Sequence, residues 1–259
     1  MRQRKVQTRL FLDPRGGIAG DMLLAALAAL GADLSRFQAM LARAGIAAGL
    51  ALVPRMRGAV AGHGLSIECR GAEPLRHLED LLGLAARLGL PPRAAARAEA
   101  AFRRLAEVEA RVHGCSVHEV HFHEVGAVDT LVDVAGACWA VDELGIDEVV
   151  CAPLPWFTGT VRCAHGLLPL PAPAVLELLA GKPVYPTEVD EEIITPTGAL
   201  LVDVLADRFA RGPSGVIRAQ ATAYGEREIA SAPWGLRALL LDDAFENAPE
   251  EAPSEEAGF

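Results

Sequence analysis

Aromatic side chains are scarce in this sequence, and paired cysteines are missing from it. Phe, Trp and Tyr make up 5% of the 259 residues, whereas hydrophobic residues make up 51%. The core must therefore be built mainly from Ala, Leu and Val. No Cys-x-x-Cys pair occurs among the five scattered cysteines, which are Cys69, Cys115, Cys138, Cys151 and Cys163. This distribution argues against a disulfide framework and a structural zinc knuckle, and it predicts reduced thiols in a cytoplasmic protein.

Long apolar runs are also missing. The longest, Met22 to Leu30, is far too short to span a bilayer, and the basic start is followed by too few apolar residues for a signal-peptide core. The formal net charge is -10, but seven acidic residues and no Lys or Arg fall in 242–259. We therefore expect no membrane span and no nucleic-acid-binding face. We also expect a folded region over 1–241 and an acidic, disordered tail over 242–259.

Helical and extended patterns alternate along the folded region. Apolar periodicity with Gly, Pro and Ser boundaries predicts helices at 22–30, 35–44, 75–88, 92–112, 128–144, 174–180 and 197–209. Strands are predicted at 8–12, 50–56, 65–70, 148–154, 160–163, 216–224 and 236–241. This interleaving favours an α/β or mixed α+β fold. A boundary near 70–75 is compatible with the pattern but not required by it.

The run from 117 to 133 is the richest in chemistry, with three histidines and several carboxylates. On an extended segment, His121 and His123 would share a face and could chelate one ion, with Glu124 nearby. Asp129 and Asp133 are four residues apart and would share one side of the following helix. Imidazole with carboxylate suits Ni, Zn, Fe or Mn. The alternative is that these histidines only pair with neighbouring carboxylates; His113 and His118 could equally be ligands or surface residues.

A strand–turn–helix pattern near the start offers a second candidate site. Asp13 ends the predicted strand, and Gly16, Gly17 and Gly20 precede the helix. Glycines and unpaired helix N–H groups suit a phosphate, although Asp21 would repel it unless a cation bridges them. The alternative is a tight turn with Asp21 as the helix N-cap.

Two further patterns have both a functional and a structural interpretation. Thr195-Pro196-Thr197-Gly198 could hold a phosphate or a metal-bound ligand, but a threonine before a helix is most often a cap. Cys163 and His165 could form a thiolate–imidazole pair. We expect Cys163 to be buried and inert, and His165 to be the functional residue of the two.

Together these blocks resemble one known family. The segments 13–22, 121–133, 164–166, 169–174 and 195–199 resemble, in the same order, the motifs of the nickel-pincer cofactor nickel-insertion proteins, the LarC family. A Gly-Tyr-Gly-type block of that family stands here as Ala223-Tyr224-Gly225-Glu226. The resemblance covers roughly 8–241. It implies insertion of Ni(II) into pyridinium-3,5-bisthiocarboxylic acid mononucleotide by a lyase-class insertase that uses CTP with Mn or Mg, and delivery of the product to lactate racemase-type apoenzymes.

The resemblance also implies residue roles. It assigns the metal to His121, His123, Glu124, Asp129 and Asp133, and catalysis to His165 and Asp21. The mononucleotide phosphate, or a cation beside it, would be held by Asp13, Gly16, Gly17, Gly20, Thr195, Thr197 and Gly198.

Family members often continue into a further C-terminal domain associated with nucleotide binding. The chain could therefore be half of a split insertase with a separate C-terminal polypeptide, a truncated form, or a divergent single-domain member. The alternative functions are a metal-dependent phosphoester hydrolase and a non-catalytic nickel carrier or subunit.

Overall fold

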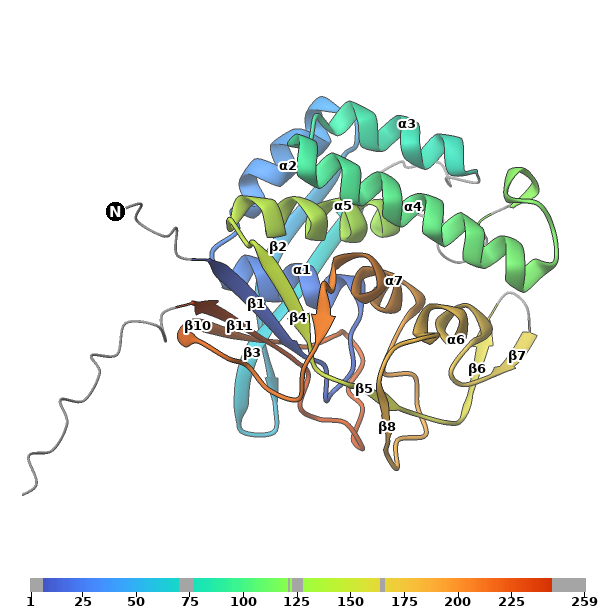
Figure 1. The fold of residues 1–259 in the computed structure, drawn as a ribbon. Helices are drawn as coiled ribbons and strands as arrows, with labels where there is room; N and C mark the ends of the chain where they lie inside the picture. Colours follow the sequence, from blue (N-terminus) through green and yellow to red (C-terminus); the bar gives the residue numbers. More distant parts are fainter. Residues whose placement is uncertain (1–6, 70–76, 121, 123–127, 164–165, 244–259) are drawn as a thin grey trace, which may run out of the picture.

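A mixed seven-stranded sheet forms the centre of the molecule, and helices cover one of its faces (Figure 1). The computed structural model describes residues 7–69, 77–120, 122, 128–163 and 166–243. The strand order is β2-β3-β10-β11-β1-β4-β9. The prediction of an α/β or mixed α+β fold is confirmed.

The sheet joins parallel and antiparallel strands from both ends of the chain. β1 (Thr8–Asp13) runs parallel to β4 (Glu148–Cys151), which is parallel to β9 (Arg208–Phe209). On its other side β1 pairs antiparallel with β11 (Leu236–Asp242), and β11 pairs antiparallel with β10 (Val216–Ala223). The long hairpin of β2 (Ala48–Arg57) and β3 (Val60–Cys69) joins β10 through β3.

Side chains alternate between the two faces of the sheet. Leu10 and Leu12 of β1 enter the large core under the helices, whereas Phe11 joins a small cluster with Val150 and Leu241 on the opposite face. This is the period-2 alternation expected of a strand with two different faces. The helices are therefore gathered on the side to which Leu10 and Leu12 point.

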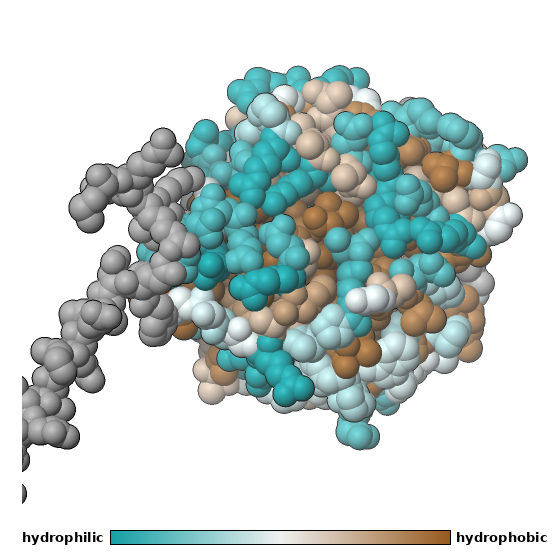
Figure 2. Space-filling view, viewed as in Figure 1, coloured by the Kyte–Doolittle hydropathy of each residue, from teal (hydrophilic) through white to brown (hydrophobic). Residues whose placement is uncertain are grey.

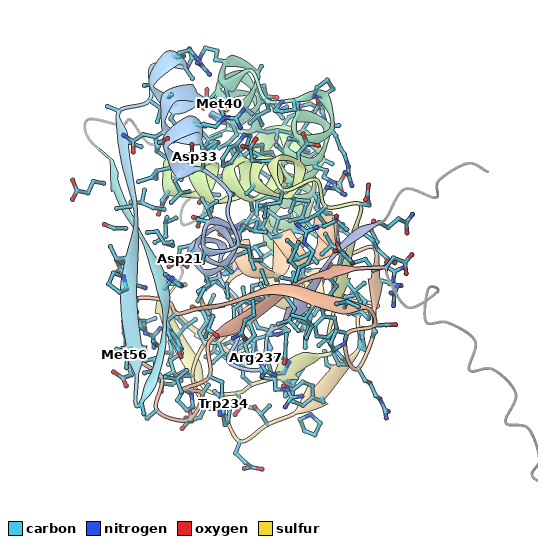
Figure 3. The ribbon with its side chains drawn as sticks, turned by 90° about the vertical axis from the view of Figure 1, so that its left-hand side faces the viewer. Asp21, Asp33, Met40, Met56, Trp234 and Arg237 are labelled. Atoms are coloured by element: carbon cyan, nitrogen blue, oxygen red, sulfur yellow. The ribbon has the colours of Figure 1, made fainter. Side chains whose placement is uncertain are left out.

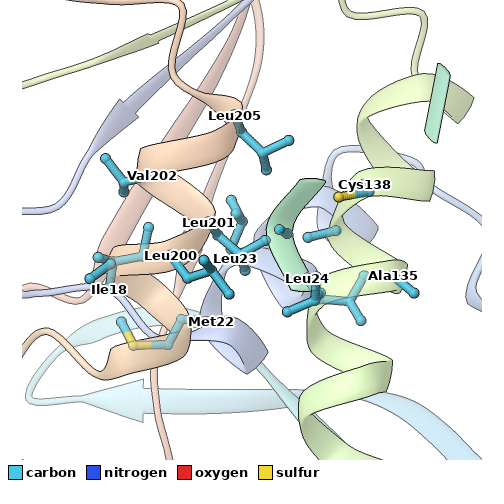
Figure 4. Packing of buried hydrophobic residues seen from close by; sticks show 14 of the residues in the cluster. Ile18, Met22, Leu23, Leu24, Ala135, Cys138, Leu200, Leu201, Val202 and Leu205 are labelled. Atoms are coloured by element: carbon cyan, nitrogen blue, oxygen red, sulfur yellow. The ribbon is translucent and has the colours of Figure 1, made fainter. Parts of the chain in front are cut away.

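The helical layer is built around α1. This helix (Gly20–Ala29) packs between α5 (Val128–Glu143) and α7 (Pro196–Leu205), and Figure 4 shows the leucines that fill the contact. α4 (Pro92–His113) packs on α5 and α7, while α2 (Leu34–Arg43) and α3 (Leu78–Leu88) complete the layer. Gly136 of α5 permits this density, because a Cβ there would lie 2.7 Å from Leu24 Cδ2.

Several short elements lie outside the main sheet. β5 (Leu154–Trp156) pairs with β8 (Val184–Pro186), and β6 (Thr160–Cys163) with β7 (Gly166–Pro169), and α6 (Pro173–Leu179) follows β7. The predicted strand at 148–154 is thus divided between β4 and β5. Val117–Glu119, at the start of the histidine-rich run, forms a 3₁₀ turn and not part of the extended segment considered for that run.

Two predicted helix ends were wrong for physical reasons visible in the contacts. The helix predicted at 197–209 ends at Leu205 because Asp207 exchanges two hydrogen bonds of 2.8 Å with the backbone of Val149, which draws the chain into β9. The cap of α2 is Asp33, whose carboxylate accepts from the Ser35 N–H at 3.0 Å. Ser35 is therefore inside the helix that it was expected to begin.

The predicted boundary near 70–75 lies outside the described residues, although the strands on both sides of it share one sheet. Asp242, assigned to the predicted tail, is the last residue of β11 and pairs with Arg218 at 2.9 Å. In the described part of the chain, no helix is both long enough and apolar enough to cross a membrane. Figure 2 shows polar side chains over most of one face, with apolar ones in separate groups.

Candidate functional site

A pocket of about 610 Å³ lies where the segments leading into three helices meet. Its wall includes Gly20 and Asp21 from the start of α1, Asp129 and Asp133 from the start of α5, and 195–197 at the start of α7. A cavity of this size suits a small-molecule ligand. Residues widely separated in the sequence therefore contribute to one site.

Two backbone segments are joined beside this pocket. The N–H of Ile18 donates to the carbonyl of Ile193 at 2.8 Å, and the N–H of Thr195 donates to the carbonyl of Ile18 at 3.1 Å. Gly17 and Gly198 make this approach possible, because a Cβ at Gly17 would lie 1.9 Å from the Ile193 oxygen and one at Gly198 would lie 2.1 Å from the Ile18 oxygen. The two helix entries are thus fixed relative to each other.

The starts of α1 and α7 present different chemistry to the pocket. Ala19 precedes α1 with no side-chain cap, so the alternative interpretation of Asp21 as the N-cap was wrong: Asp21 is the second residue of the helix. The Thr195 hydroxyl caps α7 by accepting from the Gly198 N–H at 3.1 Å. The cap interpretation of Thr195 is confirmed, and Thr197, the second residue of α7, borders the pocket.

Gly20 allows a carboxylate to lie directly against the α1 backbone. A Cβ at Gly20 would lie 2.4 Å from Asp133 Oδ2 and 2.7 Å from Asp133 Cγ. Asp133 Oδ1 is shielded from solvent and accepts no hydrogen bond from the described residues. Only glycine at position 20 leaves room for this side chain, which makes Gly20 a spacing residue for the acid cluster.

The carboxylates of Asp21, Asp129 and Asp133 make one side of the pocket acidic, which favours a positive charge there. Burial raises the pKa of Asp133 well above its ordinary value, and the charges of Asp21 and Asp129 raise it further. Burial also raises the pKa of Asp21, an effect that the Met22 N–H and Arg55 partly offset. A proton or a cation would relieve the cost of holding these carboxylates together.

Seven of the predicted site residues border this one pocket. They are Gly16, Gly20, Asp21, Asp129, Asp133, Thr195 and Thr197. Asp13 does not border it: its buried carboxylate pairs with Arg237 and lies 3.4 Å from Arg15. His121, His123, Glu124 and His165 lie outside the described residues. Within the described ranges, no three His, Cys, Asp or Glu side chains come close enough together to hold a metal ion.

The two upstream histidines are now placed. His113, the last residue of α4, lies 3.4 Å from the Glu109 carboxylate. His118 is 90% exposed on the 3₁₀ turn, 3.9 Å from Glu79. Neither borders the pocket, so their surface interpretation is favoured.

Some residues of the pocket were not singled out as site residues. Cys163 was expected to be buried, but it is partly exposed and borders the pocket. Arg57 and Arg227 bring positive charge to the wall, and Tyr224 lies beside them. For Tyr224, the signal in the sequence was the block 223–226. Arg57 itself comes from a distant hairpin, and only the folded chain brings it to this wall.

Residues 10–257 match the family model described as nickel insertion protein. The chain belongs to the nickel insertion protein family. A relative from Thermomicrobium roseum is 43% identical over 241 residues, which cover 91% of this chain and 58% of the relative. The nickel insertion family model also agrees with the motif resemblance in the sequence.

Two further relatives have more specific names. The pyridinium-3,5-bisthiocarboxylic acid mononucleotide nickel insertion protein of Staphylococcus epidermidis is 36% identical over 238 residues, with 92% of this chain and 60% of the relative covered. The protein of the same name from Desulfitobacterium hafniense is 39% identical over 222 residues, with 83% and 53% covered. The chain thus spans a little over half the length of these curated relatives. The comparison with solved structures found no match.

Proposed function

We propose that this chain takes part in inserting Ni(II) into pyridinium-3,5-bisthiocarboxylic acid mononucleotide, as a lyase-class nickel insertase or as the N-terminal half of one. The observation that carries this proposal is the aspartate-lined pocket of about 610 Å³ in a member of the nickel insertion family. The names of two relatives supply the substrate. The pocket has room for a mononucleotide and an acidic side that favours a metal cation.

Asp129 and Asp133 are the proposed nickel ligands within the described residues. α5 begins directly after 121–127, so His121, His123 and Glu124 are proposed to complete the set. Carboxylate and imidazole donors bind nickel without the closed thiolate cage that would retain it. The metal could then pass to the thiocarboxylate sulfurs of the mononucleotide. Asp21 and His165 are proposed to accept or deliver protons during this exchange.

The glycine turn and the start of α7 are proposed to contact the mononucleotide. Gly16, Thr195 and Thr197 border the pocket and can approach a ligand closely. We propose an indirect role for Asp13, Gly17 and Gly198, which fix the backbone that forms the pocket wall and do not contact the ligand. This division follows from the packing at Gly17 and Gly198.

A second cation and further proteins belong to the same proposal. The family resemblance implies CTP with Mn or Mg, and Asp21 and Asp133 supply the oxygen donors that such ions prefer. A separate C-terminal polypeptide is a proposed partner, and lactate racemase-type apoenzymes are the proposed recipients of the product.

Nickel binding by the purified chain tests the proposal. Equilibrium dialysis with Ni(II) followed by elemental analysis should give bound metal, and Asp133→Asn should weaken binding by at least about tenfold. The matched control is Glu99→Gln, because Glu99 is 55% exposed on α4 and, among the described residues, pairs with its helix neighbour Arg103. Equal nickel binding by the wild type, Asp133→Asn and a His121→Ala/His123→Ala double variant would refute the assignment.

A further inference from the structure

Two arginines of the hairpin hold one edge of the pocket by its backbone. Arg55 Nη1 donates to the Tyr224 carbonyl at 2.6 Å. Arg57 Nη2 donates to the next three carbonyls, those of Gly225, Glu226 and Arg227, at 2.9, 3.2 and 3.3 Å. Four consecutive carbonyl oxygens are therefore occupied by the side chains of one strand.

Two glycines of β3 leave room for these arginine contacts. Gly62 is opposite Arg55 in the hairpin, and Gly64 is two residues further along β3. A Cβ at Gly64 would lie 2.2 Å from Arg55 Nε, and one at Gly62 would lie 2.5 Å from Tyr224 Cε2. The side chains of Arg55 and Tyr224 thus lie directly over glycines. The reach of the arginines to residues 224–227 depends on these two positions.

Among the described residues, one exposed carboxylate pairs with the charge of Arg57 at this edge. Its side chain is 13% exposed, and its acidic neighbour is Glu228, 66% exposed and 3.9 Å away. The guanidinium carbon lies 5.6 Å from the centre of the Tyr224 ring. An exposed carboxylate 3.9 Å away is screened by solvent, so it neutralises a largely buried guanidinium poorly.

The segment Gly225–Arg227 also offers backbone hydrogen-bond donors. Among the described residues, the backbone N–H groups of Gly225, Glu226 and Arg227 have no acceptor, although all three residues border the pocket. Successive backbone N–H groups beside an arginine are the donors that bind phosphate in proteins. Figure 3 shows Met56, the neighbour of Arg57, and Trp234, which precedes Gly235 of the pocket wall, toward the same end of the molecule.

We propose that Arg57 and the backbone of Gly225–Arg227 bind the phosphate of the pyridinium mononucleotide. This inference rests on the proposed function and assigns the two ends of its substrate. The aspartates near α1 and α5 would repel a phosphate. The phosphate is therefore assigned to the edge formed by Arg57 and Gly225–Arg227, called the arginine edge below, and the metal is assigned to the acidic side. Glu226 also borders the pocket, but it is 83% exposed, which leaves Arg57 as the less screened charge.

Isothermal titration with three ligands tests this assignment. The probes are nicotinic acid mononucleotide, which is a pyridinium carboxylate mononucleotide, its nucleoside without the phosphate, and CTP. We expect the wild type to bind the mononucleotide roughly 10- to 100-fold more tightly than the nucleoside, as charge-assisted hydrogen bonds allow. Tighter binding of CTP than of the mononucleotide, or equal binding of mononucleotide and nucleoside, would overturn the assignment.

Arg57→Met should remove most of that preference while leaving the affinity for the nucleoside unchanged. Arg57→Lys keeps the charge but not the planar guanidinium whose Nη2 donates to three carbonyls, so it should recover only part of the preference for the mononucleotide. Arg103→Met is the control, because Arg103 is 55% exposed on α4, outside the pocket wall. If Arg57→Met does not fold, Arg57→Lys serves by itself, and it too should lower only the affinity for the mononucleotide. An equal loss for both ligands would show a purely structural role and refute the proposal.

Nickel binding separates this inference from the proposed function. Arg57→Met should keep the wild-type amount of bound nickel, because the arginine edge does not supply metal ligands. If the wild type binds nickel but binds the mononucleotide no more tightly than the nucleoside, only the phosphate subsite is refuted. Absence of nickel binding with phosphate preference intact would overturn the nickel assignment alone.

Discussion

Replacement of Gly20 by Ala is the sharpest test of how the acid cluster is spaced. In an isolated helix this change would stabilise, because Ala is favoured over Gly by about 1 kcal/mol. Here the added Cβ would lie 2.4 Å from Asp133 Oδ2 and 2.7 Å from both Cβ and Cγ of Asp133. The whole Asp133 side chain must therefore move, and overpacking of this kind typically costs about 1–3 kcal/mol.

Thermal unfolding measures the effect. For a chain of this size, a loss of that magnitude lowers the melting temperature by roughly 2–4 °C per kcal/mol. The control is Gly83→Ala in α3, where a new Cβ would meet nothing within 4 Å. We expect Gly83→Ala to stabilise by about 0.5–1 kcal/mol. The same chemical change should thus have opposite signs at the two positions.

A double-mutant cycle assigns the cost to the opposing carboxylate. Asp133→Gly removes the whole side chain, so Gly20→Ala should become neutral or stabilising in that background. The coupling free energy should be roughly 1–3 kcal/mol, as for contacting residues. If Gly20→Ala stabilises the wild-type protein, or costs the same with and without the Asp133 side chain, the described contact does not control the spacing of the cluster.

Three further predictions follow from the pocket and the core. Folding raises the pKa of Asp133, so its contribution to stability is greatest below the unfolded value and is lost as pH rises through the folded value. In chelator-treated protein, the melting temperature of Asp133→Asn minus that of the wild type should therefore increase from about pH 5 to about pH 8. A difference that does not change with pH would contradict this. Thr195→Ala should cost about 0.5–2 kcal/mol in chemical unfolding, whereas Thr195→Ser should cost much less, because the hydroxyl caps α7. Burial raises the pKa of Cys138 and Cys151 to about 12, so iodoacetamide should spare both in the folded chain and modify Cys163, as mass spectrometry can show. Modification of Cys138 at the rate of Cys163 would mean that the helical core opens readily.

The residues that form the acidic side of the pocket could be selected from the sequence, because each follows a local rule. Gly20 and Asp21 mark a strand–turn–helix entry, and Asp129 and Asp133 share a helix face by their four-residue spacing. Thr195 before Pro196 marks a helix start. None of these rules says that the three helix starts meet. That information lies in the contacts of Ile18 with Ile193 and Thr195.

The arginine edge shows what local rules cannot reach. Arg55 and Arg57 lie on a strand about 170 positions from the carbonyls that they bind, and their charges carry no periodic signal of that contact. Gly62 and Gly64 are equally uninformative by themselves, since a glycine in a strand has many causes. β9 was missed for a related reason: two hydrogen bonds between Asp207 and Val149 override the helical preference of the preceding residues.

By itself, the sequence determined the fold class, the positions of most helices and strands, the motif resemblance and the acidic residues of the pocket, because these depend on spacing within a few turns of the chain. The tertiary structure decided which side chains share a wall, which glycines are spacers, and that Cys163 and Arg57 border the pocket whereas Asp13 does not. These outcomes depend on contacts between distant segments, where sheet register and close packing select neighbours that no local pattern encodes.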